Sequence, residues 1–277
     1  MAAINTNISA LRASNASSMA EKMQGQSMER LSTGKRINSA RDDAAGLAIA
    51  TSMTSQIRGM NQGIRNANDG IAMAQTAEGA LNEVTNMLQR QRELTVQASN
   101  GTYSGDDLTN IKAEMTALNT QIDSVLANTQ FNGQKLFNGT AGNAGSVSIQ
   151  AGANAADTVT LDLSANLTTD ATLGAAKAVD VAALAGDGSE LTTFDTAIKT
   201  VSSKRAQLGA TQNQLDSAIN NLSNNTINLS DARSRIEDTD YSAETTALAK
   251  AQILSQASTA MLAQANQSQQ NVLSLLR

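Results

Sequence analysis

The chain of 277 residues carries 20 Lys and Arg against 25 Asp and Glu, a net charge of −5, and contains no Pro, Cys, Trp or His. Without thiol or imidazole groups it can form no disulfide, no thiolate or histidine metal site and no Ser-His-Asp triad. The acidic balance argues against a nucleic-acid partner, which requires basic patches. Any catalysis would have to use carboxylates, Lys, Ser or Tyr, and we expect no catalytic, cofactor-binding or metal site.

Small and uncharged side chains dominate the composition. Two Tyr and three Phe are too few for a bulky core, so aliphatic residues and Met must supply the buried surface, as in closely packed helices. Charged residues make up 16%, below the usual figure of about 25%, and uncharged polar residues replace the Lys and Glu that keep monomers apart. The composition favours a helical protein that associates with other chains.

The amino-terminal segment contains neither an apolar run long enough to span a membrane nor a cleavable signal peptide. We expect no membrane partner. The protein should either stay in the cytosol or leave it by a route that needs no Sec signal.

Apolar residues spaced three or four apart predict helices along most of the chain. A long, regular stripe runs from Ile57 to Ala98 and ends at Asn100-Gly101, and a second runs from Leu108 to Val125. The short connection predicts an antiparallel helix pair. A looser stripe precedes them at Ile4, Ile8, Leu11, Met19, Met23, Met28 and Leu31.

The helical period stops at the turn-forming pairs Asn132-Gly133 and Asn138-Gly139. Alternating apolar residues in SVSIQ, from Ser146, and TVTLDL, from Thr158, predict a small β-hairpin with one packed face. The stretch 166–188 has no strong period, and we expect an exposed, variable insert there.

A third stripe runs from Phe194 to Ile236, and a fourth, rich in small residues, from Ala247 to Leu275. Small residues bury little area, so the last helix should be marginal alone and should pair with the amino-terminal one. The predicted fold class is mainly α: a long antiparallel helical bundle or coiled-coil rod with paired terminal helices and a small β-hairpin insert.

Two motifs have ordinary structural explanations. STGKR, from Ser32 to Arg36, lacks the flanking glycine and hydroxyl residue of a phosphate-binding loop, so we expect a turn around Gly34. The carboxylate pairs Asp42-Asp43 and Asp238 with Asp240 lie near arginines, which favours helix capping or local ion pairs over acid-base catalysis.

Several long segments point to a family. The chain resembles the bacterial flagellins, the subunits of the flagellar filament, over roughly residues 1–140 and 195–277. The matching segments are INTNISAL, LSTGKRINSARDDAAGLAIA, QTAEGALNEV, QRQRELTVQASNGT, NTQFNGQKLFNG, SRIEDTDY and the run from Ala249 to Arg277. The chain is a short form, because only about residues 140–193 stand where larger flagellins carry extra outer domains.

The resemblance implies a structural subunit, not an enzyme, that polymerises into the filament used for swimming. It implies an inner helical domain made by 1–45 and 239–277, an outer rod made by 46–139 and 194–238, and the hairpin with its exposed insert at 140–193. The alternatives are a hook-filament junction protein, which shares paired terminal helices, and a surface adhesin on a flagellin scaffold.

Partners are also implied by the resemblance: other subunits, an export chaperone on the carboxyl-terminal segment, the filament cap, hook-filament junction proteins and the animal Toll-like receptor for flagellin. The protein would be exported unfolded through the flagellar type III apparatus and located in the extracellular filament.

Two sets of site residues follow from the resemblance and the stripes. A subunit and receptor interface is expected at Gln89, Arg90, Glu93, Leu94 and Glu114, with Leu94 supplying an apolar contact. Assembly through the terminal helices is expected at Ile4, Ile8, Leu11, Leu254, Met261, Ala265, Val272 and Leu275.

Overall fold

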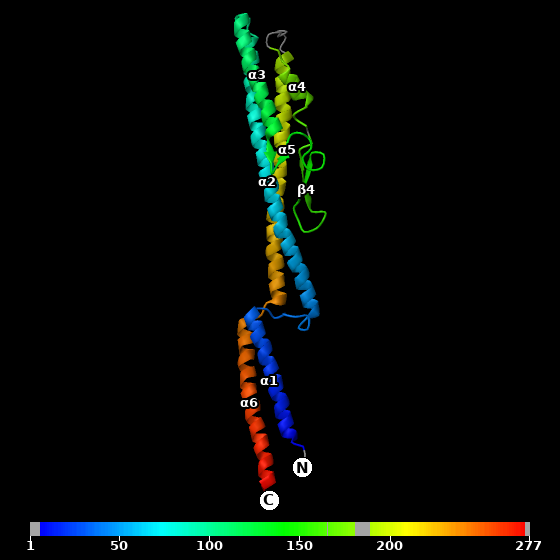
Figure 1. Ribbon diagram of the computed structural model, residues 1–277, viewed down its shortest axis with the longest axis vertical. Coiled ribbons are helices and arrows are strands. Elements are labelled where there is room, and N and C mark those ends of the chain that lie inside the picture. The colour runs from blue at the N-terminus through cyan, green and yellow to red at the C-terminus, as the bar shows by residue number, and fades with distance from the viewer. Residues whose placement is uncertain (1–5, 165, 181–188, 275–277) are drawn as a thin grey trace. The chain divides into compact units, whose positions relative to one another are not determined.

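The computed structural model is mainly α-helical, as predicted (Figure 1). It describes residues 6–164, 166–180 and 189–274, with side chains up to residue 268. The helices of these ranges are α1 Ile8–Thr33, α2 Ala44–Ala98, α3 Gly105–Asn128, α4 Ala171–Lys177, α5 Ser189–Glu237 and α6 Tyr241–Ser274. The short strands between α3 and α4 are β1 Gln130–Phe131, β2 Gln134–Lys135, β3 Ser146–Gln150 and β4 Thr158–Asp162.

The chain divides into two compact units. The terminal unit comprises residues 1–55 and 228–277, and the central unit comprises residues 56–227. Both long helices, α2 and α5, contribute residues to each unit.

The central unit buries the regular stripes of α2, α3 and α5 in one apolar core. Figure 1 shows these three helices side by side, with α4 and the β3–β4 hairpin lying along the bundle. A fully buried Leu side chain stabilises the fold by roughly 1.5–3 kcal/mol. Residues that confirm the predicted stripes are Leu81, Val84, Leu88, Leu94, Ile111, Met115, Ile122, Phe194, Val201, Leu208 and Leu215.

Several polar residues within these stripes form hydrogen bonds or ion pairs between helices. Gln91 of α2 is fully buried, and its Nε2 donates to Asn119 Oδ1 of α3 at 2.7 Å. On α5, Gln212 Nε2 donates to Oε2 of Glu78 on α2 at 3.0 Å. Arg205 Nη2, also on α5, lies 3.8 Å from Glu78 Oε1. Such pairs fix the register of packed helices, because a shift would leave buried polar groups without partners.

Two antiparallel hairpins follow α3. Asn132 and Gly133, both at positive φ, form the tight turn between β1 and β2, as the sequence predicted. In the larger hairpin, Ile149 of β3 and Leu161 of β4 are buried, which confirms the predicted packed face.

Two glycines of α2 allow the β3–β4 hairpin to pack closely against the helix. A Cβ added at Gly63 would lie 2.9 Å from the backbone carbon of Ala151, and one at Gly70 would lie 2.3 Å from Ile149 Cδ1. The two glycines are seven residues apart and therefore share one face of the helix. The hairpin packs so closely because these positions have no side chain.

The expectation of an exposed insert at 166–188 is wrong for its described part, residues 166–180. Leu167, Leu173 and Ala176 are buried in the central core, and Lys177 Nζ of α4 lies 2.6 Å from Asp123 Oδ1 of α3. Helix α4 has seven residues, too few to show a helical period in the sequence. Residues 181–188 lie outside the described residues.

Substitutions at two α2 glycines test the close packing of the hairpin. Gly79→Ala should raise the free energy of unfolding by roughly 0.5–1 kcal/mol, since nothing lies within 4 Å of the added methyl and alanine favours a helix. Gly63→Ala should lower it, because the methyl displaces hairpin backbone. Urea unfolding of the monomer measures both, and equal stabilisation by the two variants would contradict the packing.

Candidate subunit interface on the terminal helices

Helices α1 and α6 lie side by side and run antiparallel (Figure 1). Near one end of the pair, Asn7 caps α1 and its Nδ2 also donates to the Ala265 carbonyl at 3.0 Å. Near the other, the Tyr241 hydroxyl donates to the Leu31 carbonyl at 2.9 Å. The predicted pairing of the two chain ends is confirmed.

Small residues form the seam of this pair. Its buried positions recur every seven residues, the spacing of a coiled-coil seam. Ala and Ser let the helices approach closely but bury little apolar area, so the pair is weakly stabilised by its own contacts. The seam residues are Ala13, Ala20 and Ser27 on α1, and Ala251, Ser258 and Ala265 on α6.

Several larger apolar residues of these helices are exposed beside the seam. The prediction that the bulky stripe of α1 faces α6 is therefore wrong. The stripe residues Ile8, Leu11, Met19, Met23 and Met28 are all exposed. The predicted helical period followed the bulky side chains, whereas small residues on a neighbouring face of α1 make the contact with α6.

The assembly residues predicted on α6 also differ in exposure. Ala265 is buried in the seam, whereas Leu254 and Met261 are exposed. Ile4, Leu275 and the side chain of Val272 lie outside the described residues.

Four of the exposed side chains share one side of the α1–α6 pair. Met23 and Leu254 line the same groove between the two helices. Met19 precedes Met23 by four residues and Met261 follows Leu254 by seven, so each lies on the same helix flank as its neighbour. We call Met19, Met23, Leu254 and Met261 the terminal apolar strip. An exposed apolar strip of this kind marks an interaction surface.

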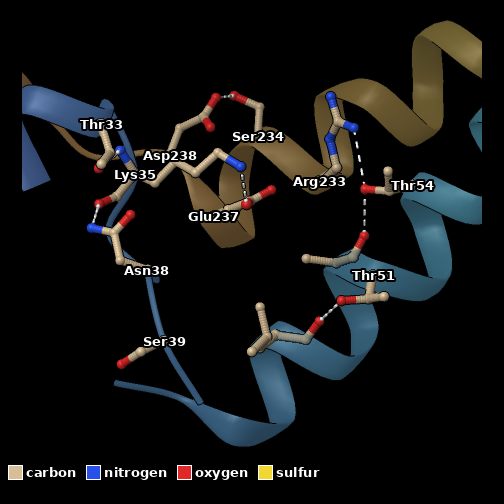
Figure 2. A network of polar contacts seen from close by, with 12 residues as sticks. Thr33, Lys35, Asn38, Ser39, Thr51, Thr54, Arg233, Ser234, Glu237 and Asp238 are labelled. Atoms are coloured by element: carbon tan, nitrogen blue, oxygen red, sulfur yellow. Dashed lines mark hydrogen bonds and ion pairs between the residues drawn. The ribbon is translucent and has the colours of Figure 1, made fainter. Parts of the chain in front are cut away.

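The segments that connect the helices of the terminal unit are joined by polar contacts (Figure 2). Lys35 Nζ lies 2.6 Å from Glu237 Oε1, and the Thr239 amide donates to the Gly34 carbonyl at 3.0 Å. Gly34 ends α1 in the left-handed conformation, which agrees with the turn predicted in STGKR. Arg233 Nη1 donates to Thr54 Oγ1 at 3.2 Å.

The carboxylates near these segments act in turns and caps, as expected. Asp43 accepts from the Gly46 amide at the start of α2, and Asp240 accepts from the Ser242 and Ala243 amides at the start of α6. Asp42 accepts from the Ser39 amide and hydroxyl and from the Asn38 amide, and these bonds lower its pKa. This contribution to stability is present above the unfolded pKa and is lost as the pH falls through the folded one.

The second predicted interface lies in the central unit. Arg90 of α2 donates to Glu114 of α3 at 2.9 Å and to Glu93 at 3.3 Å, and both bonds raise its pKa. These three residues and Gln89 are exposed. Leu94 is buried instead, because it belongs to the core stripe of α2, so it is not available as an apolar surface contact in this structure.

The described ranges contain no group of three or more Asp or Glu residues placed to hold a metal ion. No helix in them is long and apolar enough to cross a membrane.

A mainly helical chain whose paired ends leave apolar side chains uncovered belongs to the class of self-assembling structural subunits. Comparisons with known proteins identify the family. Residues 4–142 match the bacterial flagellin N-terminal helical region, and residues 191–276 match the C-terminal helical region. The chain belongs to the bacterial flagellin family and is a structural subunit of the flagellar filament, not an enzyme.

Relatives match the chain over almost its whole length. The flagellin of Bacillus subtilis (strain 168) is 45% identical over 303 aligned residues, covering 99% of each chain. The flagellin of Halalkalibacterium halodurans is 47% identical over 255, covering 92% of each. Flagellin B of Vibrio cholerae is 37% identical over 374, covering 99% of each.

Solved structures agree on the fold. The crystal structure of Bacillus cereus flagellin is 31% identical, with a TM-score of 0.50 over 57% of this chain and 88% of that one. A putative flagellar hook-associated protein from Vibrio parahaemolyticus has a TM-score of 0.59 over 71% of this chain and 100% of that one. At 16% identity the second comparison concerns the fold alone, and it does not favour a junction protein.

The seam can be tested by overfilling it. Ala20→Leu should raise the critical concentration for seeded polymerisation about tenfold, because overpacking costs roughly 1–3 kcal/mol and about 1.4 kcal/mol is a factor of ten. Ser18→Leu adds the same side chain on the exposed face of α1 and serves as control. An equal effect of both variants would refute the small-residue seam as the contact.

Proposed function

We propose that this flagellin polymerises by burying the terminal apolar strip against neighbouring subunits. The observation that supports this is the contrast between the units: the central core covers its large apolar residues, whereas α1 and α6 leave theirs exposed. The seam contributes little burial, so contact with another subunit would supply the missing apolar area. Folding of the terminal helices would then be completed by assembly.

In the same proposal, residues 1–45 and 239–277 form the inner domain of the filament, with 46–139 and 194–238 forming the outer rod. The described residues of 140–193 would lie with the rod, since the hairpin and α4 share its core. The subunit is secreted unfolded through the flagellar type III apparatus. The absence of Cys is compatible with this route.

The proposed partners follow from the exposed terminal helices. A cytosolic export chaperone would cover the carboxyl-terminal helix before export, because an apolar helix flank without a partner promotes association. The filament cap and the hook-filament junction proteins would contact the same helices at the ends of the polymer.

Truncation tests the assembly role of α6. A chain that ends before Ala243 should remain soluble and partly helical but should not extend filament seeds, because it lacks half of the seam and of the strip. Sedimentation after seeding measures this. Ordinary filaments from the truncated chain would refute the proposal, and full-length chains that never elongate would favour the junction-protein or adhesin alternative.

A finer test changes one exposed residue on each of two flanks of α6. Leu254→Ser removes an apolar group of the strip and should slow elongation about tenfold, the equivalent of about 1.4 kcal/mol. Gln252→Ser alters an exposed residue outside the strip and should leave elongation unchanged. Neither change touches the buried seam, so equal circular dichroism of the two monomers is the folding control.

The surface around Arg90 is proposed to bind neighbouring subunits in the filament and the Toll-like receptor when monomers are shed. Support comes from three exposed charges, Arg90, Glu93 and Glu114, that converge from two helices. A hot-spot charge contributes at least about 1 kcal/mol to binding. Leu94 would act by supporting this surface from the core.

Arg90→Ala should therefore reduce receptor activation by monomers about tenfold and impair motility. Arg65→Ala removes an exposed α2 arginine whose guanidinium donates to Gln62 and serves as control. Full activation by Arg90→Ala in a reporter-cell assay would refute the receptor site, and normal motility would refute its role in assembly. Leu94→Ala is a poor probe, because core truncation costs about 2–5 kcal/mol of stability.

A further inference from the structure

Seven of the ten methionines fall into an exposed group and a buried group that differ in location. Met19, Met23, Met28 and Met261, all on the terminal helices, are 66%, 43%, 56% and 64% exposed. Met60, Met73 and Met115, all in the central unit, are no more than 6% exposed. This difference in exposure bears on assembly, because three of these four exposed methionines, Met19, Met23 and Met261, belong to the terminal apolar strip.

Exposed thioethers are the most readily oxidised groups of this chain. The protein contains no Cys, Trp or His that would compete for an oxidant. Hypochlorous acid transfers its oxygen to the methionine sulfur, which loses two electrons, and chloride and a proton leave. The product, methionine sulfoxide, is polar, and methionine sulfoxide reductases return it to the thioether.

We propose that Met19, Met23 and Met261 form a sulfoxidation site that controls assembly. Oxidation of a free subunit places strong hydrogen-bond acceptors on the strip, and burying them against an apolar neighbour without partners is unfavourable. A subunit already in the filament has its strip covered, so the same sulfurs are shielded. This inference rests on the proposed function of the strip as the assembly surface.

Helix geometry supplies an internal control. Met28 follows Met23 by five residues, which at about 100° per residue places it roughly 140° further around α1. Met28 is as exposed as the strip residues but lies on another flank. Its oxidation should occur with little effect on assembly.

The test treats monomers with limiting hypochlorous acid, locates sulfoxides by peptide mass spectrometry and follows elongation from filament seeds. Oxidised wild-type monomers should elongate at least tenfold more slowly and recover after treatment with both sulfoxide reductases. The Met19→Leu, Met23→Leu, Met261→Leu triple variant should keep, after oxidation, at least half of the elongation rate that it has before oxidation. Met28→Leu should remain as sensitive as the wild type.

Filaments treated with the same oxidant should retain thioethers at Met19, Met23 and Met261 after depolymerisation. Normal elongation by monomers that carry sulfoxides at these positions would overturn the inference, as would equal oxidation of the three residues in filaments and monomers. Untreated wild-type protein that fails to elongate would instead overturn the proposed function, so the two failures are distinguishable.

Discussion

The contact between α1 and α6 is the constraint on which the function depends. Because the seam is made of Ala and Ser, the two helices pack closely yet gain little burial from each other. Their larger apolar side chains are left on the outer flanks, where a single subunit cannot cover them.

The central unit shows the opposite balance. Its helices α2, α3 and α5 bury most of their Leu, Ile and Phe residues in one core, to which α4 and the hairpin also contribute. The buried Gln91 and the half-buried Gln212 form hydrogen bonds between helices and fix how the helices align. Few large apolar side chains of this unit stay exposed, and its exposed charges, among them Arg90 and Glu114, lie on the surface of a packed core.

The segments between the helices are ordered by backbone and ion-pair contacts instead of by apolar packing alone. Lys35 forms an ion pair with Glu237 (Figure 2), and the Thr239 amide donates to the Gly34 carbonyl. Together with the caps at Asp43 and Asp240, these contacts set where α2 and α6 begin. Of the paired carboxylates, Asp42, Asp43 and Asp240 accept from backbone amides in turns or caps, and Asp238 accepts from the Ser234 hydroxyl.

The sequence by itself determined the helical class, the regular stripes of α2, α3 and α5, the β3–β4 hairpin and the family, because these depend on short-range periods and long matching segments. Tertiary structure alone decided which face of α1 meets α6, since alanines carry too weak an apolar signal to be chosen over methionines. It also decided that residues 166–180 belong to the core. Those outcomes depend on contacts between segments far apart in the chain, which no local pattern records.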